Sequence, residues 1–196
     1  VETAAAATEL YVSSESFVYS NGTYYYSFIA EEEIDYDISF ELDFGMITGM
    51  INGTDITWSY SRSNDVLIIS GKGEIPNYQG KWSKRPWHVY REYVKKVIIE
   101  EGITGIGGAA FDSFETMKEV MIADTVEYIG EEAFRTCEEL ETVVIPDAVT
   151  DIGEYAFDNC ARISEVTIPA SVGSIGRGAL LHASNIKVDS KNLTYS

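Results

Sequence analysis

The chain has 196 residues, 45% of them hydrophobic, which is enough to bury a core in one large or two small domains. Its 32 acidic and 14 basic residues give a formal net charge of −18, which disfavours binding to nucleic-acid phosphates and to anionic membrane surfaces. No apolar run approaches the roughly 18 residues of a membrane-spanning helix, so we expect no membrane insertion in this part of the protein.

The first 48 residues form an acidic, aromatic-rich zone. Residues 1–61 contain eleven acids and no base. Asn21-Gly22 lies between two aromatic-rich runs, a pattern typical of a β-hairpin. Over residues 34–44 apolar and polar residues alternate without interruption, which indicates a half-buried strand with an acidic outer face. We therefore predict a small antiparallel β module over residues 1–48.

Residues 49–93 are interpreted as strands and a loop that cap the first edge of the repeats that follow. This segment contains the one basic and aromatic stretch of the chain, "KWSKRPWHVYREY". If Trp82 and Trp87 were exposed, they would offer a surface for stacking on sugar rings. The competing interpretation, which we favour, is that the aromatic residues of the cap cover the open end of the repeats.

From residue 94 the sequence repeats every 23 residues without an insertion. Five columns keep this spacing through four units: Val97, Val120, Val143, Val166; Ile99, Ile122, Ile145, Ile168; Ile106, Ile129, Ile152, Ile175; Gly107, Gly130, Gly153, Gly176; and Phe111, Phe134, Phe157, Leu180. A period between 20 and 50 residues is typical of solenoids and related arrays. We predict a repeat solenoid over residues 94–196, with four units and a partial fifth.

Each unit is expected to contribute one short strand to a parallel sheet. Val166 and Ile168 alternate with Thr167, so the two apolar side chains face the core. The motifs "EEAF" and "EYAF" are interpreted as short helical turns that place Ala and Phe in the core, with the Phe rings of successive coils stacked. The glycine column marks a bend that needs either a positive φ or a close approach of backbone.

The segment "VVIPDAVTDIGEYAFDNCARISEVTIPASVGSIG" closely resembles the BspA-like leucine-rich repeats, whose pattern is IP-x-x-V-x-x-IG-x-x-AF-x-x-C. The match covers roughly residues 94–186, and "ITWSYSRSNDVLIISGKGEI" resembles the segment that often precedes such repeats. The resemblance implies a leucine-rich-repeat-like fold in a bacterial extracellular or cell-surface protein. It also implies a role in adhesion or binding, with no shared catalytic residues and no cofactor.

Cys137 and Cys160 hold the same position in adjacent units, which raises the alternatives of a disulfide or a pair of metal ligands. Phe114 and Ala183 hold that position in the other units. The position therefore requires an apolar residue, and a free cysteine behaves as a small buried hydrophobe. We predict two reduced and shielded thiols.

Four carboxylates of the predicted strand are candidates for a calcium site: Asp35, Asp37, Glu41 and Asp43. Alternate residues of a strand lie about 6.6 Å apart, too far for one ion without help from a loop, so a solvated acidic face is preferred and no metal is expected. His88 and His182 are the only histidines, and neither lies near a nucleophile motif. We expect no catalytic site.

Strand alternation places one column of side chains on the outside of the coils: Ile98, Met121, Val144 and Thr167. An outward column with three apolar members is more than a solvated face needs, and exposed apolar surface often marks an interaction site. We predict that these four residues bind a partner, with Trp82 and Trp87 as further candidates.

The sequence therefore favours a non-enzymatic extracellular or cell-surface module that binds protein or glycan partners through a face of the solenoid. The alternative is a carbohydrate-recognition or accessory region of a larger secreted enzyme. Binding confined to polysaccharides would favour the second interpretation.

Overall fold

The computed structural model describes residues 17–20, 23–26, 46–81, 84–192 and 194. The chain divides into two compact units, Val1–Glu41 and Leu42–Ser196. In the first unit, β1 (Phe17–Ser20) and β2 (Thr23–Tyr26) pair antiparallel, with Ser20 opposite Thr23. The predicted strand over residues 34–44 lies outside the described residues, so the antiparallel module of residues 1–48 stays a prediction.

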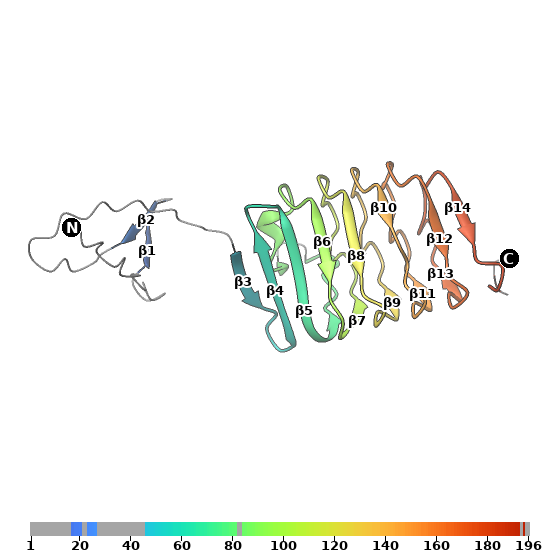
Figure 1. Ribbon diagram of the computed structural model, residues 1–196, viewed down its shortest axis with the longest axis horizontal. Helices are drawn as coiled ribbons and strands as arrows, with labels where there is room; N and C mark the ends of the chain where they lie inside the picture. The colour runs from blue at the N-terminus through green and yellow to red at the C-terminus, as the bar shows by residue number, and fades with distance from the viewer. Residues whose placement is uncertain (1–16, 21–22, 27–45, 82–83, 193, 195–196) are drawn as a thin grey trace, which may run out of the picture. The chain divides into compact units, whose positions relative to one another are not determined.

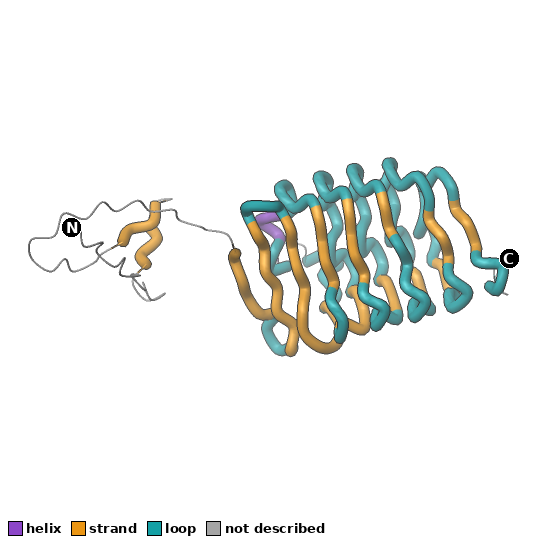
Figure 2. The backbone as a smooth tube through the Cα atoms, viewed as in Figure 1, coloured by secondary structure: helices purple, strands orange, loops and turns teal. Residues whose placement is uncertain are grey.

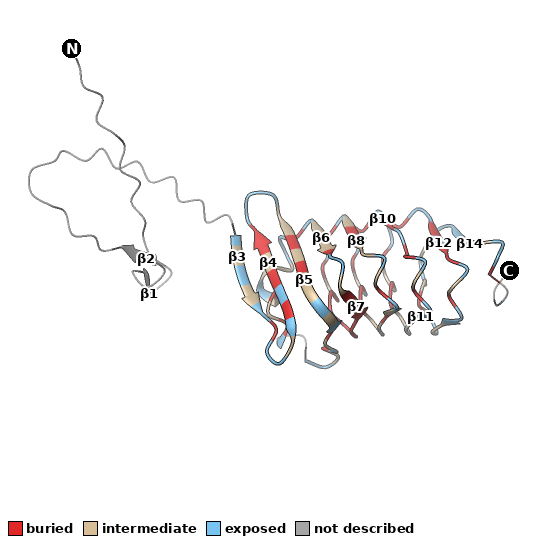
Figure 3. Cartoon of the chain, turned by 60° about the horizontal axis from the view of Figure 1, so that its bottom comes forward, coloured by how far each residue is buried: buried red, intermediate tan, exposed pale blue. Residues whose placement is uncertain are grey.

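The second unit begins with three antiparallel strands, β3 (Met46–Met50), β4 (Asp55–Ser61) and β5 (Val66–Ile75). Buried residues alternate with more exposed ones along β4, as Figure 3 shows, because one face of this sheet covers the core. The boundary expected at residue 48 falls inside β3, which pairs with β4 along its whole length. Residues 46–48 therefore belong with the second unit.

The long strand β5 is where the sheet changes from antiparallel to parallel. Its first residues pair in parallel with β6 (Lys96–Ile99), and its last residues pair in parallel with β7 (Ile103–Ile106). Between these two parts Gly71 and Gly73 adopt φ values of 118° and 105°, which side chains rarely allow. One strand therefore supplies the first edge for both rows of strands in the solenoid.

The solenoid contains two rows of parallel strands. The first ladder consists of β6, β8 (Glu119–Ile122) and β10 (Thr142–Val143). The second ladder consists of β7, β9 (Tyr128–Ile129), β11 (Asp151–Ile152) and β13 (Ser174–Ile175). In Figure 1, β6, β8 and β10 form one row, and β7, β9, β11 and β13 form the other; Figure 2 shows the same strands in orange. The strands β12 (Val166–Ile168) and β14 (Ile186–Val188) pair with each other beyond β10.

The pairing confirms the predicted register, because residues one period apart lie opposite each other. Val97 faces Val120 in the first ladder, and Ile106 faces Ile129 in the second. The sequence predicted one strand in each coil, whereas the structure has two. The final pair departs from the period, since Val166 faces Ile186, twenty positions later.

The connection from the second ladder back to the first is a series of tight turns rather than the expected helical turn. Ala133 and Phe134 are buried as predicted, but Glu132 beside them has a φ of 57°. Thr136, four residues further on, also has a φ of 57°. A right-handed helical turn cannot contain these left-handed residues, so this part of the prediction is wrong. A short 3-10 helix, His88–Tyr90, lies in the cap.

The predicted phenylalanine stack is confirmed and extends one step further than expected. Phe111 lies 5.3 Å from Phe134 and Phe134 lies 5.2 Å from Phe157, measured between ring centroids, with nearly parallel planes. Trp87 of the cap stacks on Phe111 at 5.6 Å. The aromatic core of the repeats therefore continues into the cap.

The cap also completes the backbone hydrogen bonds of the first coil. Between later coils, N–H groups of one coil donate to carbonyl oxygens of the next, as Phe111 does to Ala133. In the first coil the equivalent oxygens belong to Gly108, Ala110 and Asp112. Their donors are, in that order, the Tyr78 N–H, the Trp87 indole N–H and the Arg85 guanidinium, at 2.8, 3.0 and 2.8 Å. Three groups of the loop therefore replace the donors of a preceding coil.

A candidate binding face on the first ladder

The outward column of side chains lies where strand alternation places it. Val97 and Ile99 are buried, and Ile98 between them is half-buried on the outer side of β6. Ile98 faces Met121, and Val144 follows the pair Val143–Val120 by one residue, so it lies opposite Met121. Met121 is 49% exposed and Val144 is 77% exposed.

Thr167, the fourth predicted member, is exposed in the middle of β12. It faces Lys187 of β14, so the column ends in polar residues. At the other end the column continues into β5, where the half-buried Ile68 faces Ile98. We define the apolar row as Ile68, Ile98, Met121 and Val144.

Two exposed methionines of β3 extend the same face, and sequence reasoning missed them. Met46 and Met50 are 61% and 63% exposed, and their pairing through β4 and β5 puts them on the outer side of the sheet. Methionine is flexible and polarizable and is over-used at adaptable binding surfaces. The available signal was the alternation in "MITGM", which repeats the outward parity of the apolar row.

Two shallow grooves run beside the apolar row. One groove, of about 470 Å³, is lined by Ile98 and Met121 and also by Glu100 and Glu101. The other, of about 410 Å³, contains Val144 among its lining residues. The lining of the second groove is Glu141, Thr142, Val143, Val144, Ile145, Asp147, Ser164, Glu165, Thr167, Pro169 and Asp189. All four residues of the predicted outward column therefore line a groove.

Trp87 of the cap loop is not part of this face. Trp87 is fully buried: it stacks on Phe111 and donates its indole N–H to the Ala110 oxygen. The prediction that Trp87 binds a partner is wrong, because its ring is buried in the core beneath the cap. Tyr78 is buried beside it, and Trp82 lies outside the described residues.

The two cysteines are free and buried, which confirms the prediction for both. The Cys137 thiol donates to the Phe111 oxygen at 3.3 Å, and the Cys160 thiol donates to the Phe134 oxygen at 3.1 Å. Burial raises the pKa of Cys137 well above its usual value, and the neighbouring Cys160 raises it further. A thiol held in its neutral form is a poor nucleophile and a poor metal ligand.

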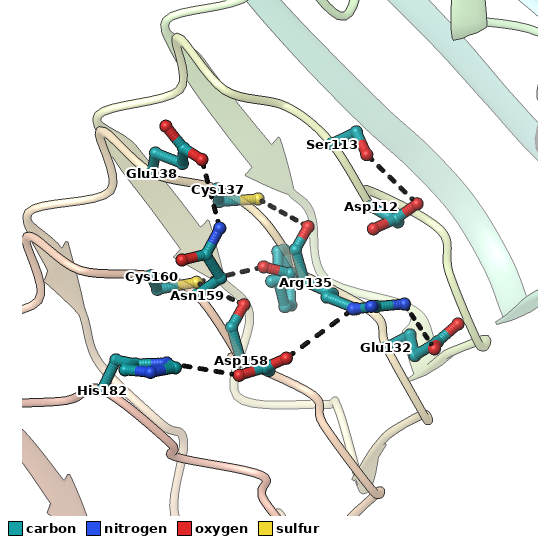
Figure 4. Close-up of polar contacts among 11 residues, drawn as sticks. Asp112, Ser113, Glu132, Arg135, Cys137, Glu138, Asp158, Asn159, Cys160 and His182 are labelled. Atoms are coloured by element: carbon teal, nitrogen blue, oxygen red, sulfur yellow. Dashed lines mark hydrogen bonds and ion pairs between the residues drawn. The ribbon is translucent and has the colours of Figure 1, made fainter.

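The histidines lie in separate places, away from each other and from the apolar row. His88 is in the cap loop, where burial, followed by the charges of Arg85 and Arg91, lowers its pKa. His182 lies in the turn of the fourth unit, with its Nδ1 3.4 Å from Oδ1 of Asp158. The other oxygen of Asp158, Oδ2, lies 3.7 Å from Nε of Arg135 (Figure 4).

In the described part of the chain, no cluster of three or more His, Cys, Asp or Glu side chains could hold a metal ion. The acidic residues Asp35, Asp37, Glu41 and Asp43 lie outside that part. None of its helical segments has the length and apolar character to cross a membrane.

Comparisons with known proteins agree with this architecture. Residues 89–192 match, in six copies, the family model described as the BspA type leucine rich repeat region. A leucine-rich repeat protein from Eubacterium ventriosum has a TM-score of 0.59 and 32% identity, with 75% of this chain and 45% of that chain covered. No curated protein matched the chain.

Two further solved structures share the fold at lower identity. A leucine rich cell surface protein from Faecalibacterium prausnitzii has a TM-score of 0.56 and 19% identity over 73% of this chain and 40% of that one. A leucine-rich repeat protein from Bacteroides ovatus has a TM-score of 0.55 and 19% identity, covering 78% and 41%. This chain spans less than half the length of each of these three proteins.

Proposed function

Because this chain belongs to the BspA-type leucine-rich repeat family, we propose that it is a binding module of a bacterial cell-surface protein and that it recognises a protein partner through the apolar row. Repeat proteins of this kind commonly bind partners along an extended face of the solenoid. The structurally similar Faecalibacterium protein is described as a cell surface protein, which supports the proposed location.

The observation that carries the proposal is the exposure of the apolar row. The inward positions Val97, Val120 and Val143 already fill the core under the first ladder, so folding does not require Met121 and Val144 to be apolar. Exposed apolar side chains in one contiguous row, beside two grooves, lose water-accessible area only when a partner covers them. The proposed activity is binding without catalysis.

The alternative, a carbohydrate-recognition or accessory region of a larger secreted enzyme, depends on exposed aromatic rings. The burial of Trp87 removes one of the two rings that the sequence offered for stacking on sugars. The apolar row carries Ile, Met and Val in place of aromatic residues, and such side chains suit the apolar patches of proteins better than they suit sugar rings. The described residues therefore favour a protein partner.

The test uses the double variant Met121→Lys with Val144→Lys. Both side chains point outward, so we expect the melting temperature to stay within a few degrees of the parent chain. The parent and the variant are applied to an array of purified extracellular proteins and to a glycan array. Array proteins that bind the parent chain are expected not to bind the variant.

A matched control carries Ala161→Lys with Ser174→Lys, which adds the same charge at exposed positions away from the apolar row. This control is expected to bind like the parent. A Met121 and Val144 variant that folds and still binds would place the site elsewhere, and one that unfolds would show that these side chains belong to the core. Binding confined to glycans would favour the alternative function.

A further inference from the structure

The two sides of the apolar row differ in how their charges are neutralised. On the side where the strands of the first ladder begin, acids and bases lie together. Lys96 pairs with Glu119 at 3.1 Å, and the next acid of the same column, Glu165, pairs with Lys187 at 2.6 Å. This side is therefore nearly neutral and is internally satisfied.

On the side where the strands end, acids predominate, although the Lys72 side chain lies beside Gly102 at this edge. We define the acidic column as Glu101, Asp124 and Asp147, which are successive residues at the 23-residue period. All three are exposed, and among the described residues none forms an ion pair. Glu101 lines the groove beside Met121, and Asp147 lines the groove beside Val144.

Two other carboxylates strengthen the same edge. Glu100 accepts a hydrogen bond from the Ser70 hydroxyl at 2.6 Å, and Asp189 accepts one from the Lys191 backbone N–H at 2.7 Å. Both bonds are to neutral donors, so they leave the negative charge in place. The apolar row is therefore bordered, on the side where the strands end, by a column of carboxylates that form no ion pair among the described residues.

A partner that covers the apolar row must also displace water from this acidic edge. Removing water from a carboxylate raises the free energy of binding unless a positive charge takes the place of that water. An acidic partner would also be repelled by the carboxylates. A lysine or arginine opposite the edge removes both penalties. Inorganic cations do not offer the same explanation, because no metal-binding cluster is present among the described residues.

We propose that the partner of this face is a basic protein segment, which lays apolar side chains on Ile98, Met121 and Val144 and lysine or arginine side chains on the acidic column. The proposal rests on the proposed function, because it assigns the chemistry of the partner at the same face. The one-sided charge also fixes the orientation of the segment, since its basic side must lie over the strand ends.

The probes are two fluorescently labelled peptides with identical valine and leucine residues, separated by lysine in one peptide and by glutamate in the other. Fluorescence anisotropy measures their binding to the chain at about 50 and about 300 mM NaCl, where screening differs strongly. The lysine peptide is expected to bind more tightly than the glutamate peptide by at least about tenfold, with a smaller difference at high salt. Equal binding of the two peptides, or binding of neither, overturns the proposal.

The variant Glu101→Lys with Asp147→Lys locates the site. It is expected to weaken binding of the lysine peptide by at least about tenfold. The matched control, Glu127→Lys with Glu131→Lys, makes the same change in net charge at exposed positions beside β9 of the second ladder. The control is expected to bind nearly as well as the parent. An equal loss in the control would reveal attraction to the overall charge and would overturn the assignment.

A third variant, Met121→Ser with Val144→Ser, removes apolar surface without a change in charge. If it weakens the lysine peptide while the acidic-column variant does not, the face binds but the inference about a basic partner is wrong. If neither variant weakens the peptide, the proposed function of this face fails as well. Weakening by both variants supports both proposals.

Discussion

At the scale of single residues, the glycine column shows what a repeat pattern leaves open. The sequence allowed two reasons for Gly107, Gly130, Gly153 and Gly176, a positive φ or a close approach of backbone. The structure selects the second: a Cβ on Gly153 would lie 2.4 Å from the Glu131 backbone nitrogen, and none of the four has a positive φ. The left-handed positions lie elsewhere in the coil, at polar residues such as Asn159.

The close contact makes Gly153→Ala destabilising. The added methyl group meets backbone of the adjacent coil, which cannot move without shifting the whole stack, so we expect a loss of about 1–3 kcal/mol in the free energy of unfolding. Urea denaturation followed by circular dichroism measures it. The control is Gly173→Ala, where no atom lies within 4 Å of the new Cβ and φ is not positive. A similar loss in both variants would show that close approach is not the reason for the glycine.

The buried thiols give a second test at this scale. Because Cys137 and Cys160 are fully enclosed, and burial raises the pKa of Cys137, a thiol reagent at neutral pH is expected to label neither residue in the folded chain. Two thiols are expected to react in denaturant without a reductant. A count of zero in denaturant would instead reveal a disulfide, and rapid labelling of the folded chain would mean that the turns around Cys137 and Cys160 open.

At the scale of elements, the sequence predicted the register of the repeating parts residue by residue, whereas for the cap it predicted strands and a loop without their pairing. The same register occurs in all four repeat units. It predicts the strands of the first ladder, the buried Phe column and the outward direction of Ile98 and Met121. The cap has no second copy against which to align it. Trp87 lies 24 residues before Phe111, one position off the period, so its place in the stack was hidden.

The binding face was predictable to the same extent. The register gave the members of the apolar row that lie inside the repeats. It could not give Ile68, because nothing in the sequence showed that β5 is the first strand of the parallel ladder. Nor could it show that Met46 and Met50 share the outer face, because that depends on two antiparallel pairings.

The indole hydrogen bond of the cap can be tested with Trp87→Phe. The phenyl ring keeps the stacking on Phe111, but the buried Ala110 oxygen loses its donor, and leaving it unsatisfied costs about 1–3 kcal/mol. The control is Trp58→Phe, since the buried indole nitrogen of Trp58 has no acceptor among the described residues. Both changes remove similar volume, so thermal or urea unfolding should show a larger loss for Trp87→Phe. A larger loss for Trp58→Phe would contradict the assigned role of the cap.

At the scale of the second unit, stability is the sum of coils and of the contacts between neighbours. Each of the first three coils contributes one strand to each ladder and one ring to the aromatic stack, and adjacent coils are joined by backbone hydrogen bonds. Such an array has no single long-range contact on which the whole depends. Its length can therefore change in steps of one period, provided that the register is kept.

Deletion of residues 129–151 removes one whole coil and joins Tyr128 to Ile152, so that Gly107 is next to Gly153 and Phe111 next to Phe157 in the shortened stack. We expect a folded chain that unfolds cooperatively with a lower urea m value, because less surface is exposed on unfolding. The free energy of unfolding should fall by about 1–3 kcal/mol, from roughly 0.05–0.15 kcal/mol per residue removed. Deletion of residues 129–140 is the control: it removes fewer residues but shifts every later column, and we expect it to abolish cooperative unfolding. If the shorter deletion were the more stable of the two, stability would depend on chain length rather than on the register that aligns the coils.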